Sequence, residues 1–224
     1  MEIHPPHGRR LAGPPAPEPP SDALAAEELS QDRARQLLRR YGILFRELLA
    51  HELPALQWSA VFRSLRLLEL SGEVLTGHFF AGIAGLQFLS PHALRLLDSE
   101  LPRSIWWIAA ADPASPCGLG LQGLPYETPP RLASTHLVFH GPELALVSRR
   151  LGRDLLIRVP PRHPYLGGYL ACLRALADRG ASPQKAMETE VINGVSALDS
   201  PYLDDFLEAG FEKGFKTLSL RKTR

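Results

Sequence analysis

Apolar residues in the first third of the chain recur at spacings of three and four, which predicts amphipathic helices. Three helices are expected in succession, over about 30–41, 45–53 and 56–71, with Ser30 as N-cap of the first and Gly42 at its end. The pattern then changes to that of a β-hairpin, with strands over 73–80 and 86–89 around the small residues 81–85. Three short helices followed by a hairpin are the plan of a winged-helix domain.

The second half of the chain is rich in predicted strands. Ile105 to Ala110 is an uninterrupted apolar run, which favours a strand buried on both faces. Further strands are expected over 135–140, 143–149, 154–159, 188–192 and 216–220. Helices are expected over 90–98, 165–179 and 200–209, the last with Ser200 as N-cap and Pro201 at its first position.

The predicted fold class is therefore α+β, with two structured parts. A winged-helix domain occupies 30–98, and a small antiparallel β-barrel or curved-sheet module with two helices occupies 103–221. Residues 1–29 are expected to be a disordered leader, since the first 20 residues hold seven of the chain's 21 prolines.

Composition adds little about function. Hydrophobic residues make up 45% of the chain and charged ones 22%, and the net charge is +1, so a signal for nucleic acid must be local. No stretch approaches the roughly 18 apolar residues of a membrane span, and the N-terminus lacks a signal-peptide core. By elimination we expect a cytoplasmic protein without a membrane partner. Cys117 and Cys172 have no zinc-site spacing, which favours two reduced thiols over a disulfide.

The third predicted helix has the arrangement of a recognition helix. Ser59, Arg63 and Arg66 share one face, while an apolar face lies opposite, made of Val61, Leu65 and Leu68. Gln57, at the helix start, is a candidate contact for a base or a phosphate. The segment from 32 to 66 holds seven arginines against three acids, so it is locally basic. An ordinary solvated helix face is an equal alternative on these residues alone, and the order of elements favours nucleic acid only by analogy.

The predicted wing, residues 76–85, has no Lys or Arg, and His78 is its single candidate cation. Its backbone amides and Phe79 or Phe80 are candidate contacts for DNA, although buried core aromatics are the favoured interpretation. Such a wing indicates recognition of backbone or shape and not of base sequence.

Motifs for catalysis are scarce. The chain has neither a phosphate-binding glycine loop nor a nucleophile elbow, so we expect no ATP hydrolysis and no cofactor. Asp112 follows an apolar strand and is a weak candidate for a catalytic carboxylate, but capping of the turn before Pro113 is the favoured role. His136 and His140 share a strand face, which leaves a weak metal site as an alternative to the expected absence of metal.

Several runs resemble one known family. Residues 39–47, Arg39-Arg40-Tyr41-Gly42-Ile43-Leu44-Phe45-Arg46-Glu47, are similar to the opening of the C-terminal part of bacterial large helicase-related proteins (Lhr). Further matches follow in order at 77–88, at 109–118 with Asp112-Pro113, at Ile192-Asn193-Gly194, at Ser200-Pro201 and at Ala209-Gly210-Phe211. Together they cover nearly all of 33–220.

The resemblance implies a DNA-handling role. Those proteins are DNA-dependent ATPases that translocate on single-stranded DNA and unwind 3′-tailed duplexes. Their C-terminal region resembles AlkZ-type DNA glycosylases, with tandem winged helices before a β-barrel. This chain resembles the last winged helix and the barrel without the motor, so ATPase and helicase activity do not carry over. The family's glycosylase aspartate lies near the C-terminus, whereas Ser219 to Arg224 here contains no acid.

The expectation is a DNA-binding accessory region of a DNA repair protein. Its partners would be single-stranded or tailed duplex DNA, recognised with little sequence specificity, and a separate helicase motor. Two alternatives stay open: a uracil-DNA glycosylase module, and a module for protein interaction or homo-oligomer assembly.

Overall fold

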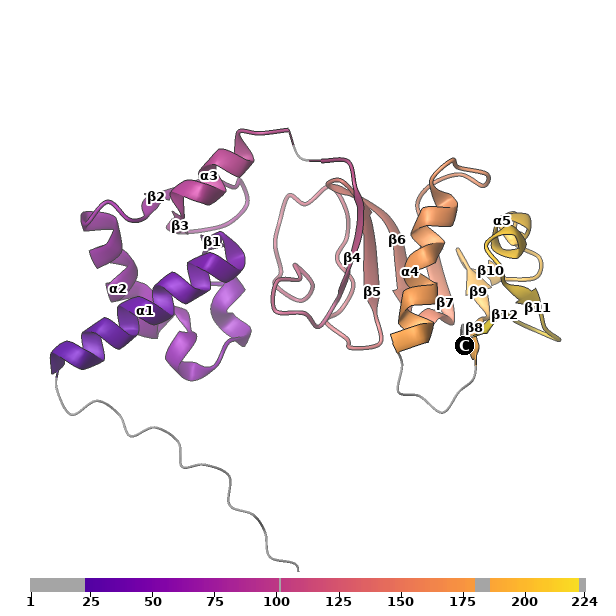
Figure 1. Cartoon of the computed structure of the whole chain (residues 1–224), viewed down its shortest axis with the longest axis horizontal. Coiled ribbons are helices and arrows are strands. Elements are labelled where there is room, and N and C mark those ends of the chain that lie inside the picture. Colours follow the sequence, from indigo (N-terminus) through magenta and orange to yellow (C-terminus); the bar gives the residue numbers. More distant parts are fainter. Residues whose placement is uncertain (1–22, 101, 180–185, 222–224) are drawn as a thin grey trace, which may run out of the picture.

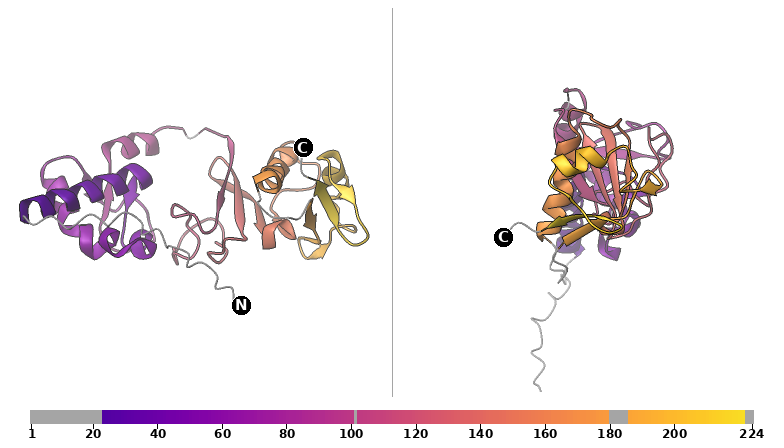
Figure 2. Two further views of the ribbon diagram at one scale, coloured as in Figure 1. Left: turned by 60° about the horizontal axis from the view of Figure 1, so that its bottom comes forward. Right: turned by 90° about the vertical axis from the view of Figure 1, so that its right-hand side faces the viewer.

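The computed structural model describes residues 23–100, 102–179 and 186–221, so the predicted leader as far as residue 22 lies outside the described residues. The described chain is elongated. In Figure 1 and in the left view of Figure 2, the winged-helix elements (indigo to magenta) lie at one end of the long axis and the last elements (yellow) at the other.

The first part has the expected winged-helix order, which confirms the predicted fold class. Its elements are α1 (Ala23–Tyr41), β1 (Ile43–Leu44), the 3-10 turns η1 (Leu48–His51) and η2 (Pro54–Leu56), α2 (Trp58–Leu70), β2 (Leu75–Gly77), β3 (Gln87–Leu89) and α3 (Pro91–Leu97). Strands β1 and β2 both pair antiparallel with β3. The core between the helices and this small sheet includes Leu37, Leu49, Leu65 and Phe88, which are almost completely buried.

Three details of this part differ from the sequence-based prediction. The strand expected over 73–80 is only β2, Leu75–Gly77, because the amides of Phe79 and Phe80 bond to the side chain of Gln87. Helix α1 begins at Ala23 and not at Ser30, because 23–29 are mostly strong helix formers. The Ser30 hydroxyl therefore lies inside the helix, where it accepts a hydrogen bond of 2.8 Å from Ser64. Of the second helix predicted over 45–53, only the 3-10 turn η1 is helical, and a second turn, η2, follows it. Leu53 is extended before Pro54, as is usual for a residue that precedes proline, and this separates η1 from η2.

The second part is built on a six-stranded sheet in the order β10-β9-β7-β6-β5-β4 and a three-stranded sheet in the order β11-β12-β8. The strands are β4 (Ile105–Ala109), β5 (His136–His140), β6 (Glu143–Arg149), β7 (Asp154–Ile157), β8 (Ala186–Thr189), β9 (Val191–Ile192), β10 (Val195–Ser196), β11 (Glu212–Lys213) and β12 (Leu218–Arg221). A 3-10 turn, η3 (Arg150–Gly152), joins β6 to β7. The larger sheet is open, with β4 and β10 at its edges, and its β7–β9 pair is parallel while the others are antiparallel.

Each face of the six-stranded sheet is covered differently. Helix α4 (Leu166–Arg179) packs on one face, where Leu146, Leu155 and Leu173 share a core with the short helix α5 (Leu203–Glu208). On the other face the long segment after β4 folds back over Leu137 and Phe139 and buries Cys117. The sheet is therefore a two-sided layer, and the segment after β4 is one of its two covers.

Strand β4 is an edge strand, so the prediction that it is buried on both faces was wrong. Trp106 is 42% exposed, stacks on Phe139 with ring centroids 4.3 Å apart, and donates from Nε1 to the carbonyl of Gly141 at 2.8 Å. Indole is amphipathic, so a tryptophan run that looks fully apolar also suits a half-exposed edge.

The predicted strand 188–192 and the predicted helix 200–209 also differ from the structure. The strand divides at Glu190 into β8 and β9, which belong to different sheets, because the Glu190 amide bonds to the carbonyl of Arg153. Helix α5 starts only at Leu203, since Ser200 closes a turn in which its hydroxyl accepts from the Tyr202 amide at 3.3 Å.

One buried amide side chain organises the wing. Gln87 on β3 is fully buried, and its Oε1 accepts from the amides of Phe79 and Phe80 at 3.0 and 2.9 Å. Its Nε2 donates to the carbonyls of Phe80 and Ile83 at 3.0 and 3.3 Å. All four bonds of this side chain go to the backbone of the wing loop, so the loop has one defined conformation.

We expect Gln87→Leu to lower the free energy of unfolding by about 2–3 kcal/mol, because it leaves two amides and two carbonyls of the wing without partners. Chemical denaturation measures the loss. Gln36→Leu, the same change at an exposed position of α1, is expected to stay within about 0.5 kcal/mol of the unmodified chain. Equal effects of the two substitutions would contradict this role of Gln87.

Candidate nucleic-acid interface

Helix α2 presents the polar face that the sequence predicts. Val61, Leu65 and Leu68 are buried, whereas the predicted contact residues Ser59, Arg63 and Arg66 are all exposed on the other side of the helix. Gln57 occupies the N-cap position, but its side chain donates to the carbonyl of Glu52 at 3.1 Å. Ser59, Arg63 and Arg66 thus lie on one exposed surface, whereas the Gln57 side chain is bonded to the backbone of the protein.

Among the described residues, each of the two arginines of this surface has one ion-pair partner, more distant for Arg63 than for Arg66. The Arg63 side chain is 83% exposed, and its Nε lies 3.7 Å from a carboxylate oxygen of Glu27. Arg66 forms an ion pair with Glu69, one helical turn further along α2. Exposed pairs of this kind contribute only about 0–1 kcal/mol, so either guanidinium can turn to a phosphate at small cost.

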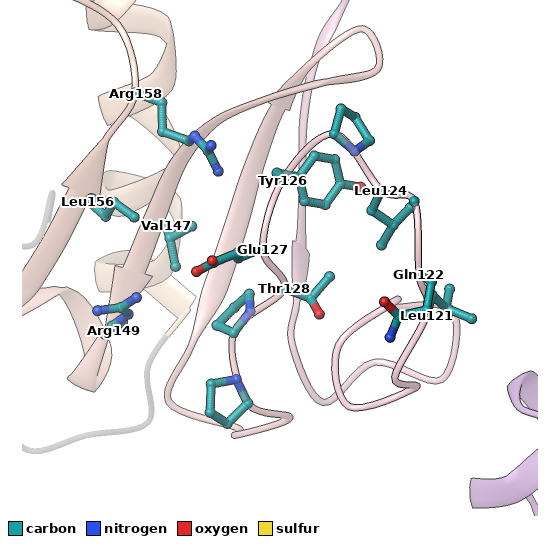
Figure 3. A pocket seen from close by; sticks show the side chains of 14 residues that line it. Leu121, Gln122, Leu124, Tyr126, Glu127, Thr128, Val147, Arg149, Leu156 and Arg158 are labelled. Atoms are coloured by element: carbon teal, nitrogen blue, oxygen red, sulfur yellow. The ribbon is translucent and has the colours of Figure 1, made fainter. Parts of the chain in front are cut away.

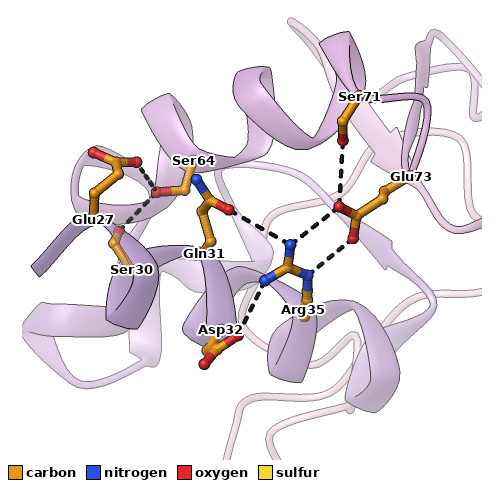
Figure 4. Close-up of polar contacts among 8 residues, drawn as sticks. All are labelled: Glu27, Ser30, Gln31, Asp32, Arg35, Ser64, Ser71 and Glu73. Atoms are coloured by element: carbon orange, nitrogen blue, oxygen red, sulfur yellow. Dashed lines mark hydrogen bonds and ion pairs between the residues drawn. The ribbon is translucent and has the colours of Figure 1, made fainter. Parts of the chain in front are cut away.

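Helix α2 is held against α1 by a polar network on the opposite side (Figure 4). The buried Ser64 hydroxyl lies 2.8 Å from that of Ser30 and 3.2 Å from a carboxylate oxygen of Glu27. Glu27 on α1 therefore contacts two residues of α2, the buried Ser64 and the exposed Arg63.

Arg35 has a structural role in the same network. It reaches from α1 to both carboxylate oxygens of Glu73, at 2.9 and 3.0 Å, and to Asp32 at 3.0 Å. The hydrogen bond to Glu73 raises the pKa of Arg35, and the same bond lowers the pKa of Glu73. This bidentate pair fixes α1 to the residue that precedes the wing, so the Arg35 guanidinium is already in use.

The wing contacts the second part of the chain. Ile83 of the wing and Leu119 and Leu121 of the segment after β4 pack on the winged-helix core. At the wing tip, a Cβ added to Gly82 would lie 2.5 Å from the carbonyl oxygen of Gln122. The amides of Phe79 and Phe80, which were candidate DNA contacts, already bond to Gln87, and His78 is exposed beside them.

The comparisons with known proteins agree with this geometry. Residues 23–104 match the family model of the winged-helix domain of large helicase-related protein. No curated protein matches the chain. The match runs from the start of α1 to the residue before β4, so it covers the exposed face of α2 and the wing and leaves the β-rich part outside it.

Asp112 lies in a turn that the chain itself stabilises. Its Oδ1 accepts from the amide of Ala114 at 2.9 Å, which is the geometry of turn capping, and the side chain is exposed. Arg131 donates to the carbonyls of Ala111, Asp112, Ser115 and Cys117 at 3.0–3.5 Å and holds this loop together.

The remaining candidates do not converge on a site. Cys117 and Cys172 are free, as predicted, and both are buried, and this burial raises the pKa of both thiols, that of Cys172 to about 12. His140 Nδ1 lies 2.8 Å from the Tyr169 hydroxyl, whereas His136 packs edge-on against Trp107, and burial lowers the pKa of His136. Residues 23–100, 102–179 and 186–221 contain no group of three or more His, Cys, Asp or Glu that could hold a metal ion.

In the same described ranges, no helix has the length and apolar character needed to cross a membrane.

Sequence reasoning missed the residues that shape the wing. Gln87 stands between Leu86 and Phe88 in an apolar strand, and a lone amide in such a strand was a signal that a buried polar group needed partners. The approach of Gly82 to Gln122 had no comparable signal, because it joins residues 40 positions apart in two different structural parts.

Two glycines of the wing provide a matched test of its contact with the loop at 119–123. Both Gly82 and Gly85 have positive φ, +79° and +82°, so alanine at either costs about 1–2 kcal/mol of stability. A Cβ at Gly85 meets nothing within 4 Å, whereas at Gly82 it overlaps the backbone of Gln122. We expect Gly82→Ala to lower the midpoint of thermal unfolding clearly more than Gly85→Ala does. Equal losses would mean that the wing does not dock on this loop.

Proposed function

We propose that this chain is a DNA-binding accessory region of a repair protein of the large helicase-related type, and that it binds through the exposed face of α2. Unwinding would come from a separate ATP-driven motor. The observation that carries the proposal is the pair of exposed arginines, Arg63 and Arg66, on the helix that the winged-helix fold uses for recognition.

The face of α2 suits contact with the DNA backbone. Arg63 and Arg66 are three positions apart, so their side chains are neighbours on the helix surface and can reach phosphates of the same groove. Ser59, one turn earlier, adds a hydroxyl that can bond to phosphate. Two cations and a hydroxyl position a helix on DNA but identify few bases, which supports binding with little sequence specificity.

The docked wing supports the same conclusion. A wing that grips DNA needs free amides or cations, but here Gln87 accepts from the amides of Phe79 and Phe80, and the tip faces Gln122. We therefore assign DNA contact to α2 and assign the wing to the joint between the two parts. Tailed duplex DNA is the proposed substrate, and the duplex portion is the part that α2 holds.

Arg63→Ala/Arg66→Ala is expected to weaken binding of a fluorescent tailed duplex at least about tenfold at moderate salt, because two phosphate contacts are lost. The slope of log K against log salt concentration should become shallower by about 1.8, at about 0.9 for each contact on duplex DNA. Fluorescence anisotropy at several salt concentrations measures both quantities.

Arg221→Ala is the matched control. Arg221 on β12 is 76% exposed and pairs with an acid, Glu212, much as Arg63 pairs with Glu27. This variant should bind like the unmodified chain. If the double variant keeps its circular dichroism spectrum and also keeps full affinity and slope, α2 is not the DNA contact.

A further inference from the structure

A groove in the β-rich part is not explained by the role of α2. It has a volume of about 910 Å³ and lies between the segment 121–130 and the strands β6 and β7 (Figure 3). Its floor is Val147 and Leu156, and the ring of Tyr126 lies on the opposite wall. Leu156 is 36% exposed although it lies inside a strand of the sheet, whereas Val147 is buried, so Leu156 is the apolar part of the floor that the described chain leaves open.

Two arginines stand at opposite ends of this floor. In the register of the sheet, Val147 pairs with Leu156, and Arg149 and Arg158 lie two residues beyond them in opposite directions along the strands. They are therefore offset by about four residues, or about 13 Å. Figure 3 shows the two guanidinium groups separated in this way, with Val147 and Leu156 between them.

The charge of these arginines is largely free. Arg158 has no ion-pair partner among the described residues, and Arg149 approaches Asp154 only at 4.0 Å. The neighbouring arginines, by contrast, are engaged, since both Arg150 and Arg153 pair with Glu190. The groove therefore has a positive charge at each end, with the apolar side chain of Leu156 and the carboxylate of Glu127 between them.

We propose that this groove binds single-stranded DNA, which deepens the proposed function and rests on it. A single strand exposes bases between its phosphates, so two phosphates can reach Arg149 and Arg158 while a base lies against Leu156 and Tyr126. A duplex keeps its bases paired inside and gains nothing from an apolar floor. The groove thus takes the tail of a tailed duplex, and α2 takes the paired part.

The carboxylate of Glu127 is expected to weaken the binding of phosphate in this groove. The carboxylate lies within the groove between the two arginines, on the segment that also carries Tyr126 (Figure 3). A phosphate and a carboxylate in one groove repel each other, so removing this charge should strengthen binding. General damage to the fold would weaken binding. Tighter binding after Glu127 is replaced by an uncharged residue would therefore show that the effect is electrostatic.

Arg149→Ala/Arg158→Ala in the full chain is expected to weaken binding of a short fluorescent oligothymidylate about tenfold. The salt slope should become shallower by about 1.4, at about 0.7 for each contact on a single strand. Glu127→Gln should bind the same oligonucleotide more tightly than the unmodified chain. Arg153→Ala is the control, because Arg153 has a similar exposure to Arg149, 43% against 46%, but does not line the groove.

Binding of a blunt duplex distinguishes the contact proposed for the groove from the contact proposed for α2. Affinity for this duplex should be unchanged in Arg149→Ala/Arg158→Ala and lost in Arg63→Ala/Arg66→Ala. If the groove variants bind oligothymidylate normally while the α2 variant still loses the duplex, the groove proposal is overturned and the proposed function stands. If the groove variants lose affinity for the oligonucleotide while the α2 variant keeps its affinity for the duplex, DNA binding by α2 is overturned and binding in the groove stands. Competition by polyglutamate as strong as that by oligothymidylate would overturn the assignment to single-stranded DNA in favour of an acidic protein partner.

Discussion

The geometry of this chain depends on the buried side chain of Gln87. One amide bonds to four backbone groups of the wing loop and so gives a glycine-rich loop without charge a single shape. That shape brings Gly82 against the carbonyl of Gln122, in the segment that follows β4. The wing thereby becomes the joint between the winged helix and the β-rich part. The same segment continues as the wall of the groove above β6 and β7, so both candidate DNA contacts are connected through this joint.

Charge is distributed locally in a chain of almost zero net charge. Some arginines are committed to the fold: Arg35 clamps Glu73, Arg40 pairs with Glu52, and Arg131 holds the turn at Asp112. Others, such as Arg63 and Arg158, have a weak partner or none among the described residues. A count of cations along the sequence mixes these two kinds. The difference lies in the partners: Arg35 bonds to both carboxylate oxygens of Glu73, the Glu52 side chain that Arg40 meets is only 10% exposed, and Arg131 donates to four carbonyls, whereas an exposed single contact costs little to break.

Local patterns in the sequence were sufficient for features that depend on one element. The spacing of Val61, Leu65 and Leu68 predicts which side of α2 is buried, and the order of helices and hairpin predicts the winged helix. Features that depend on distant partners were not predictable. The exposure of Trp106 follows from the position of β4 at the sheet edge, and the break at Glu190 follows from a bond to Arg153. The groove belongs to the same class, since its two arginines come from different strands and its wall from a third segment.

The central claim is that α2 and not the wing meets DNA, and backbone amide chemical shifts test it most directly. The full chain would be labelled with ¹⁵N and titrated with a tailed duplex. We expect the largest changes along α2 at Ser59 to Arg66, a second set on β6 and β7 around Arg149 and Arg158, and little change at 78–85. Large changes confined to the wing loop, with α2 unaffected, would contradict it.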